Sequence, residues 1–204
     1  MLNVSVIGMG IGEKHVQTYL ENVHCNLISI CDFDKNKIHE LGNKYPGIKI
    51  YENCQVILND PNIDLVSIAS YDNYHCEQVI TAIKNNKHVM VEKPLCLNEK
   101  ELNRIHRIHS KNNNIFISSN FVLRSNDRFI KLKNKINSND FGDISFIDCD
   151  YLWGRKEKLF GWRAEMDFYS IILGAAIHMV DLVMWILESK PKSVYATGNQ
   201  IGLE

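Results

Sequence analysis

The sequence predicts an α/β protein that begins with a Rossmann-like, doubly wound parallel sheet and continues into an incomplete α+β second domain with an open sheet. Three observations predict the first part. Apolar strand candidates alternate with helix candidates from residue 2 to about residue 120. A glycine turn, Gly8-Met9-Gly10-Ile11-Gly12, joins the first strand to the first helix. An acidic residue, Asp32, follows the second strand, 20 residues after Gly12.

Six strands and five helices are expected in this first part. Short apolar or alternating runs predict the strands at residues 2–7, 26–31, 48–51, 64–69, 87–91 and 115–119. Helical runs are expected near residues 13–22, 35–44, 53–59, 74–85 and 98–112. Pro46-Gly47 and Asn85-Asn86 separate neighbouring elements, as turn residues do.

The pattern changes beyond residue 120, where a domain boundary is expected. Helices are predicted for residues 124–136 and 170–188, and strands for residues 144–153 and 193–197. Residues 1–120 would form the first domain, and residues 121–204 a partial second domain. Two strands seldom make a stable sheet, so we expect the chain to be truncated within this second domain.

The glycine turn predicts a dinucleotide site. Glycines let the backbone approach a pyrophosphate closely, and the free N–H groups at the start of a helix point at it. The candidate residues are Gly8, Gly10 and Gly12, although the third glycine comes one position earlier than in G-x-G-x-x-G. Asp32 would accept hydrogen bonds from the ribose hydroxyls, which favours NAD over NADP. A purely structural turn is the alternative.

The stretch Val89–Pro94 predicts a second functional position. It begins as a buried parallel strand, and Pro94 cannot continue a central strand ladder. Glu92 and Lys93 should therefore lie at the carboxyl edge of the sheet, where ligands bind in open α/β folds. A lysine held there is partly desolvated, which favours its proton-accepting form. The alternative is an ordinary solvated turn.

Two ionisable residues interrupt the very apolar helix predicted for residues 170–188. His178 and Asp181 are three positions apart, so they share one face of the helix. A neutral imidazole is well suited to accept a proton near neutral pH. The alternative is a buried pair satisfied by the backbone.

Composition excludes several other classes. A formal net charge of −1 with 45% hydrophobic and 23% charged residues gives no electrostatic case for nucleic acid. The six cysteines form no C-x-x-C pair, so we expect neither a zinc site nor a disulfide framework. The first strand starts at residue 2 without a leader, and a reduced, cytoplasmic setting without membrane association is expected.

These motifs together resemble the Gfo/Idh/MocA oxidoreductases, which are NAD(P)-dependent enzymes acting mostly on sugars, polyols and sugar derivatives. The resemblance covers the whole chain, and it implies that residues 121–204 are part of a domain for substrate binding and oligomerisation whose open sheet is incomplete here. It rests on the glycine turn followed by His15, on Ser70-Tyr-Asp-Asn-Tyr-His75, on Glu92-Lys-Pro94 and on His178-Met-Val-Asp181.

The resemblance implies roles for several residues. Lys93 would contact both nicotinamide and substrate, and His178 would be the catalytic histidine. Asp181 would be a substrate-side acid. The cofactor would also contact Ser70, His75 and Glu92.

The sequence departs from the family in three places. Family members often carry an acid four residues before the catalytic histidine, where this chain has Gly174. Phe168-Tyr169-Ser170 replaces the usual glycine-rich run, and Tyr71 stands where a proline is common.

Further candidates for holding sugar hydroxyls or a phosphate are Arg124, Trp162 and Arg163, with ordinary surface or packing roles as the alternative. The predicted function is hydride transfer between NAD and a carbinol or carbonyl of a sugar, polyol or sugar-nucleotide. The other hypothesis is a non-catalytic dinucleotide-binding fragment, or a sensor of the same fold. No metal is expected, and the full-length protein is expected to be a homo-oligomer.

Overall fold

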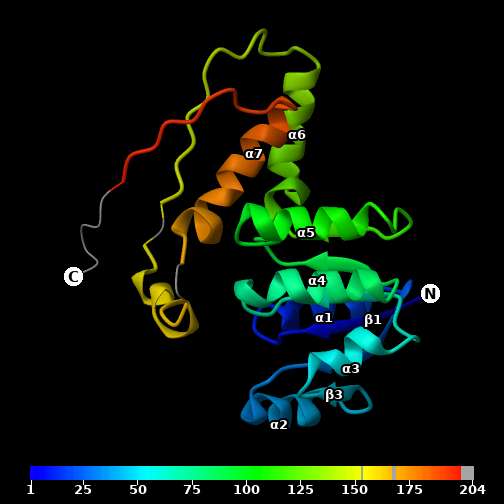
Figure 1. Cartoon of the computed structure of the whole chain (residues 1–204). Coiled ribbons are helices and arrows are strands. Elements are labelled where there is room, and N and C mark those ends of the chain that lie inside the picture. The colour runs from blue at the N-terminus through cyan, green and yellow to red at the C-terminus, as the bar shows by residue number, and fades with distance from the viewer. Residues whose placement is uncertain (153, 167–168, 199–204) are drawn as a thin grey trace. The chain divides into compact units, whose positions relative to one another are not determined.

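The structure, a computed structural model, describes residues 1–152, 154–166 and 169–198 (Figure 1). The chain divides into two compact units. The first contains Met1–Asn120 and Trp153–Gly174, and the second contains Phe121–Leu152 and Ala175–Glu204. The assignment of residues 121–204 to a single second domain stays a prediction.

The first unit contains a six-stranded parallel sheet in the order β3-β2-β1-β4-β5-β6. The strands are β1 Leu2–Ile7, β2 Cys25–Cys31, β3 Lys49–Tyr51, β4 Leu65–Ile68, β5 His88–Val91 and β6 Ile117–Ser119. Strands β2 and β3 are added on one side of β1, and β4, β5 and β6 on the other, so the order of strand addition reverses between β1 and β4. This is the doubly wound Rossmann order, and the predicted fold class is confirmed.

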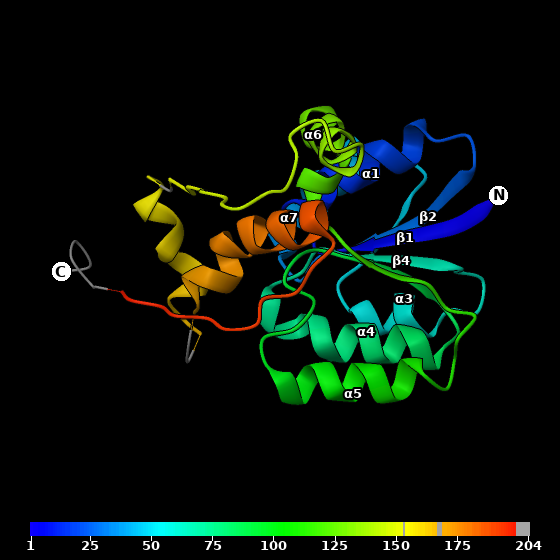
Figure 2. The ribbon, with the colours of Figure 1, turned by 90° about the horizontal axis from the view of Figure 1, so that it is seen from above.

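Five helices cover the two faces of this sheet. They are α1 Gly12–Glu21, α2 Lys35–Lys44, α3 Cys54–Asn59, α4 His75–Lys84 and α5 Glu99–His109. Figure 2 shows α1 on one face and α3, α4 and α5 on the other. The buried core divides in the same way. Val16 and Leu41, from α1 and α2, pack with Val6 and Ile30 of the sheet.

On the other face, apolar side chains of α3, α4 and α5 pack against β1, β4 and β5.

Most helices begin at the polar cap that the sequence supplies. Asp34, Asn53 and Asn98 accept hydrogen bonds from backbone N–H groups of the first turns of α2, α3 and α5. Helix α1 has no side-chain cap. Its first N–H groups therefore remain available to a ligand at the glycine turn.

The described part of the second unit is helical. It contains a 3₁₀ turn, Val122–Ser125, and the helices α6 Asp127–Asn137 and α7 Ile177–Leu187. A π-helical turn, Ile172–Ala176, leads into α7. Lys133 of α6 donates a hydrogen bond to the backbone oxygen of Trp185 of α7 at 2.8 Å. Both helices predicted beyond residue 120 are therefore present.

The prediction of two strands beyond residue 120 is wrong for the described residues. Residues 144–152 and 193–198 form no strand, and Trp153 lies outside the described residues. These segments carry strand-forming side chains, but Phe146 and Tyr195 are exposed. A strand requires a hydrogen-bonded neighbour as well as a suitable sequence, and the described residues of this unit provide none.

Among the described residues, no helix is long and apolar enough to cross a membrane.

Candidate functional site

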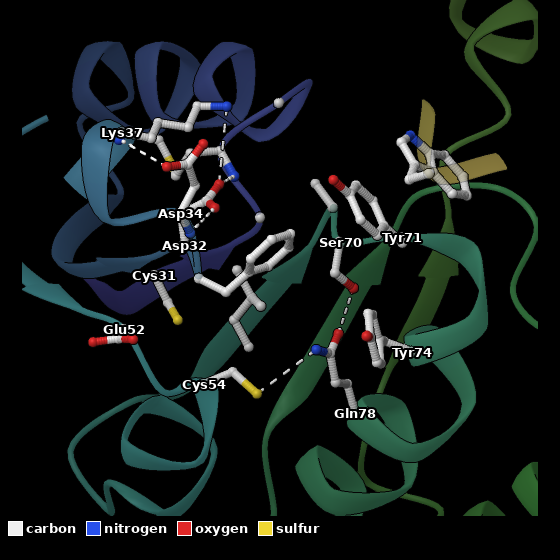
Figure 3. Close-up of a pocket in the computed structure, with 17 residues that line it drawn as sticks. Cys31, Asp32, Asp34, Lys37, Glu52, Cys54, Ser70, Tyr71, Tyr74 and Gln78 are labelled. Atoms are coloured by element: carbon white, nitrogen blue, oxygen red, sulfur yellow. Dashed lines mark hydrogen bonds and ion pairs between the residues drawn. The ribbon is translucent and has the colours of Figure 1, made fainter. Parts of the chain in front are cut away.

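A cavity of about 490 Å³ opens at the carboxyl ends of β1, β2 and β4, where the order in which strands are added to the sheet reverses. Ligands of doubly wound sheets bind at this place. Figure 3 shows Asp32, Asp34 and Lys37 on one side of the cavity, and Ser70, Tyr71, Tyr74 and Gln78 on the other. The lining residues are Ile7, Gly8, Met9, Gly10, Cys31, Asp32, Phe33, Asp34, Lys37, Glu52, Cys54, Ala69, Ser70, Tyr71, Tyr74, Gln78 and Trp162.

The glycine turn forms one rim of this cavity. Gly8 has φ +86°, and a Cβ atom at this position would lie 2.5 Å from the carbonyl oxygen of Ala69. Gly10 has open space around its Cα atom, which leaves room for a phosphate group. Gly12 packs closely instead, because a Cβ atom there would lie 3.1 Å from side-chain atoms of Val6 and Ala69. Gly8 and Gly10 line the cavity, while Gly12 lets α1 approach the sheet.

Asp32 is the main acidic group of the cavity, and its side chain is held from two sides. One carboxylate oxygen accepts a hydrogen bond from the N–H of Met9 at 2.7 Å, and the other accepts from the N–H of Asp34 at 3.0 Å. Lys37 Nζ lies 3.9 Å from Asp32, whereas the exposed Lys35 pairs with Glu52. This arrangement presents a fixed carboxylate, which suits ribose hydroxyls and opposes an added phosphate.

The opposite wall of the cavity is aromatic. The ring of Tyr71 stacks on Trp162 with centroids 4.5 Å apart and planes 7° apart, and Phe33 meets Tyr71 edge-on at 5.4 Å. The guanidinium of Arg163 lies 4.2 Å from the centroid of the Trp162 ring. Flat apolar surfaces of this kind suit the purine ring of a nucleotide.

A short polar chain forms the floor of the cavity. Ser70 donates a hydrogen bond from its hydroxyl to the amide oxygen of Gln78 at 2.6 Å, and Gln78 donates to the Cys54 sulfur at 3.7 Å. Burial raises the pKa of the neighbouring Cys31 to about 12, with smaller contributions from Cys54 and Asp32. The thiol of Cys31 therefore stays protonated and acts as an apolar lining group.

His75 does not line this cavity. Its side chain is fully buried, and its ring nitrogens lie 2.7 Å from the backbone oxygen of Pro94 and 3.1 Å from that of Ser70. The ring thus bridges the loops that follow β4 and β5. A direct contact of His75 with a cofactor, which the sequence suggested, does not fit this burial.

Glu92 follows β5 and belongs to a buried polar network. Its carboxylate lies 3.0 Å from His15 Nε2 and accepts a hydrogen bond from the Asn120 side chain at 2.6 Å. Burial raises the pKa of Glu92, but the hydrogen bonds from His15 and Asn120 outweigh this effect, and the pKa lies below its usual value. Glu92 is therefore an anion beside Lys93.

Lys93 also lies at the carboxyl end of β5, as predicted, and the Lys93-Pro94 peptide bond is cis. Lys93 Nζ donates a hydrogen bond to the backbone oxygen of Gly174 at 2.7 Å. A Cβ atom at Gly174 would lie 1.8 Å from the hydroxyl oxygen of Tyr169. The space that a side chain at position 174 would need is thus filled by Tyr169. Phe168, the other departure in this segment, lies outside the described residues.

The remaining candidates lie in different surroundings. Arg124 and Asp181 bind each other in the second unit through two hydrogen bonds, one of 2.9 Å, although they are 57 residues apart. His178 of α7 stacks with Tyr151, with ring centroids 6.3 Å apart. Trp162, a predicted candidate for holding substrate, lines the cavity described above, and the guanidinium of Arg163 lies over its ring. Among the described residues, no group of three His, Cys, Asp or Glu side chains could hold a metal ion.

Sequence reasoning missed several residues of the cavity. Gln78, Cys54 and Lys37 were not singled out, because each comes from a helix whose pattern is ordinary. One signal was available for Lys37. It lies one turn into the helix that follows Asp32, so it faces the same edge of the sheet.

Comparison with known proteins identifies the family. The sequence profile of the oxidoreductase family with an NAD-binding Rossmann fold, Gfo/Idh/MocA, matches residues 2–121. The chain belongs to this family. The profile of the Gfo/Idh/MocA C-terminal domain matches residues 129–203. The resemblance and the NAD cofactor expected from the motifs are both confirmed.

The chain is similar to curated inositol dehydrogenases. It is 28% identical over 199 residues to myo-inositol 2-dehydrogenase of Thermotoga maritima, a match that covers 97% of this chain and 58% of the relative. It is 23% identical over 196 residues to inositol 2-dehydrogenase of Salmonella typhimurium, with coverages of 95% and 56%. The chain thus spans somewhat more than half the length of these relatives.

Solved structures show the same fold. The crystal structure of myo-inositol 2-dehydrogenase from Lactobacillus plantarum superposes with a TM-score of 0.81 at 26% identity, covering 91% of this chain and 56% of the other. Scyllo-inositol dehydrogenase from Lactobacillus casei, solved with NAD(H) and scyllo-inositol, gives a TM-score of 0.79 at 20% identity, with the same coverages.

The cavity residues fit a bound NAD. Gly8 lets the turn approach the backbone of Ala69 closely, and the open space at Gly10 leaves room for a phosphate group. The uncapped start of α1 suits the pyrophosphate, and Asp32 suits the adenosine ribose.

Proposed function

We propose that this chain is the larger part of an NAD-dependent dehydrogenase that oxidises a carbinol of a cyclic polyol or related sugar, or reduces the corresponding carbonyl. The observation that carries the proposal is Lys93. It places an ammonium group at the carboxyl end of β5, two strands from the glycine turn of an NAD-binding sheet. The inositol dehydrogenases among the relatives support a polyol substrate.

Different residues of the chain would have separate roles in the reaction. NAD supplies the hydride acceptor when it is bound. Lys93 would stabilise the negative charge that develops on the substrate oxygen, because a nearby ammonium favours an alkoxide. His178 would take the hydroxyl proton, which must leave when the carbinol is oxidised. Asp181 would orient the substrate together with its ion-pair partner Arg124.

The charge state of Glu92 supports the role of Lys93. Its pKa lies below the usual value, so Glu92 remains anionic across the neutral range. The carboxylate is hydrogen-bonded to His15 and Asn120, so the position of the negative charge near Lys93 is fixed. Glu92 attracts the ammonium group of Lys93 electrostatically, and Lys93 Nζ is held by its hydrogen bond to the Gly174 backbone oxygen.

Substitution of the two proposed catalytic residues tests this function. Lys93→Met and His178→Ala should each lower NAD-dependent polyol oxidation by roughly 10²-fold or more. NADH affinity should change little for His178→Ala. Lys35→Met is the matched control, because Lys35 is exposed and pairs only with Glu52 at 3.8 Å. Unchanged turnover in either catalytic variant would refute the assignment.

A second function stays open because of Gly174. The Tyr169 hydroxyl occupies the space where a carboxylate side chain would project, so the chain lacks an acid at this position. The second candidate is therefore a dinucleotide-binding sensor that binds NAD without turnover. Tight NADH binding with no oxidation of any polyol, by the full-length protein, would favour this candidate. A cytoplasmic location and a homo-oligomeric state remain predictions.

A further inference from the structure

A buried chain of hydrogen bonds crosses the first unit behind the cavity. His15 of α1 lies at its centre, with Nδ1 2.8 Å from the Ser67 hydroxyl and Nε2 3.0 Å from Glu92. Asn120 donates a hydrogen bond to the same Glu92 oxygen at 2.6 Å. Ser67 is completely buried, and the side chains of His15 and Glu92 are only 12% and 14% exposed.

The chemistry of the partners fixes the direction of the bond to Glu92. Glu92 is an anion and can only accept, so the Nε2–H of His15 donates to Glu92. The Nδ1 atom of His15 shares the second hydrogen bond with the Ser67 hydroxyl, at 2.8 Å. A hydrogen bond to a carboxylate is charge-assisted and is therefore the stronger of the two.

The chain links the elements that form the site. His15 lies three residues after Gly12, in the first turn of the helix that begins at the glycine turn. Ser67 belongs to β4, and Asn120 directly follows β6. Glu92 immediately precedes Lys93, and its own N–H is bonded to the backbone oxygen of Ile68 at 2.8 Å. One imidazole thus connects the helix that faces the pyrophosphate with the strand end that carries the lysine.

We propose that His15 is a positioning residue that acts through Glu92 to hold the carboxyl end of β5, and with it Lys93, in place relative to the bound cofactor. The proposal rests on the proposed function for its kinetic consequence. A small displacement of a reacting group from its productive position can cost orders of magnitude in rate. The alternative is a histidine that only satisfies buried polar groups.

Two substitutions of His15 separate these roles. An asparagine amide lies near the position of Nδ1, so His15→Asn keeps a partner for Ser67 and loses the contact with Glu92. A glutamine amide reaches the position of Nε2, so His15→Gln keeps a donor for Glu92 and loses the contact with Ser67. Each variant removes one hydrogen bond of the buried network, so their stability costs should be similar. Ser67→Ala is the matched control for the contact that the proposal does not use.

The first readout does not depend on activity. The rate at which an acetylating ester modifies Lys93 is measured by peptide mass spectrometry, with the exposed Lys84 as internal standard. His15→Asn should raise this rate by about threefold or more, because Lys93 is held less firmly against Gly174, whereas His15→Gln and Ser67→Ala should stay within about twofold. Equal changes in the two His15 variants, or the reverse order, would overturn the proposal.

The second readout compares the effect of each variant on kcat with its effects on the NAD Kd and on the KM for polyol. His15→Asn should lower kcat by roughly tenfold or more with little change in the NAD Kd or in the KM for polyol, while His15→Gln keeps most of the turnover. A fall in NAD affinity with unchanged kcat would overturn the proposal. If the wild-type protein shows no turnover, the proposed function fails, and the labelling rates still decide the role of His15.

Discussion

Replacement of Asp32 by asparagine should change the cofactor preference of the protein. The wild-type protein should bind NADH at least tenfold more tightly than NADPH, which corresponds to about 1.4 kcal/mol. Asp32 is 8% exposed, and both of its carboxylate oxygens are fixed by backbone N–H groups. The carboxylate therefore cannot rotate away from an added 2′-phosphate.

The expected size of the effect follows from the charges at this edge of the cavity. Two unit charges 4 Å apart interact by about 1 kcal/mol in water and by about 4 kcal/mol at an effective dielectric constant near 20. A phosphate monoester carries roughly −1.5 to −2 charges at neutral pH. Lys37, 3.9 Å from Asp32, offsets part of this repulsion, while Asp34 and Glu52 also line the cavity and add to it. Asp32→Asn should therefore shift the NADH-to-NADPH preference by about tenfold or more toward NADPH.

Fluorescence titration of both reduced cofactors measures this shift. Lys37→Met should increase the preference for NADH, because it removes the positive charge nearest to Asp32. Lys84→Met is the control and should leave the preference unchanged, since Lys84 is exposed at the end of α4 and does not line the cavity. The wild-type preference should also weaken at high salt, where surface charges are screened. Equal or tighter NADPH binding by the wild-type protein would refute the reasoning.

Three further outcomes are expected. Gly8→Ala should abolish NADH binding or prevent folding, because a Cβ atom there would lie 2.5 Å from the Ala69 carbonyl oxygen; normal NADH titration would contradict this. Burial lowers the pKa of Lys87, so the unfolded chain binds more protons than the folded one between the lowered pKa and the ordinary lysine value. The unfolding free energy of the wild-type protein should therefore rise relative to that of Lys87→Met as the pH increases through this range. Denaturant unfolding at several pH values measures this difference, and a constant difference would be evidence against it. Residues 1–120 alone should form a soluble monomer that binds NADH. The whole chain should self-associate through exposed apolar residues of the segment 171–187. A monomeric 204-residue protein in size-exclusion chromatography would show this prediction to be wrong.

The Rossmann elements could be predicted because each of them is specified locally. Strands such as β1 and β5 are short apolar runs that end at a glycine turn or a proline, and both signals are readable within a few residues. Helices α2, α3 and α5 begin at Asp34, Asn53 and Asn98, which carry their caps in the sequence. The resulting alternation predicts a parallel sheet, and the fixed hand of parallel crossovers leaves few strand orders.

What could not be predicted depends on contacts between distant residues. Residues 144–152 alternate like a strand, but strand formation needs a neighbour that a single segment cannot reveal. The pairing of Arg124 with Asp181 spans 57 positions, so two separate substrate candidates proved to be one ion pair. His15 was visible only as part of a motif, and its contact with Glu92 emerged from the fold.

The close packing of Tyr169 against Gly174 constrains the order in which this site can change. A carboxylate at position 174 would have to displace the Tyr169 hydroxyl, which lies 1.8 Å from the place of the new Cβ atom. Substitution at position 174 alone should therefore be harmful, while substitution of Tyr169 by a smaller residue first would open the space. An attempt to install an acid in this protein by directed evolution should thus recover the two changes as a pair, with the tyrosine replaced before the glycine.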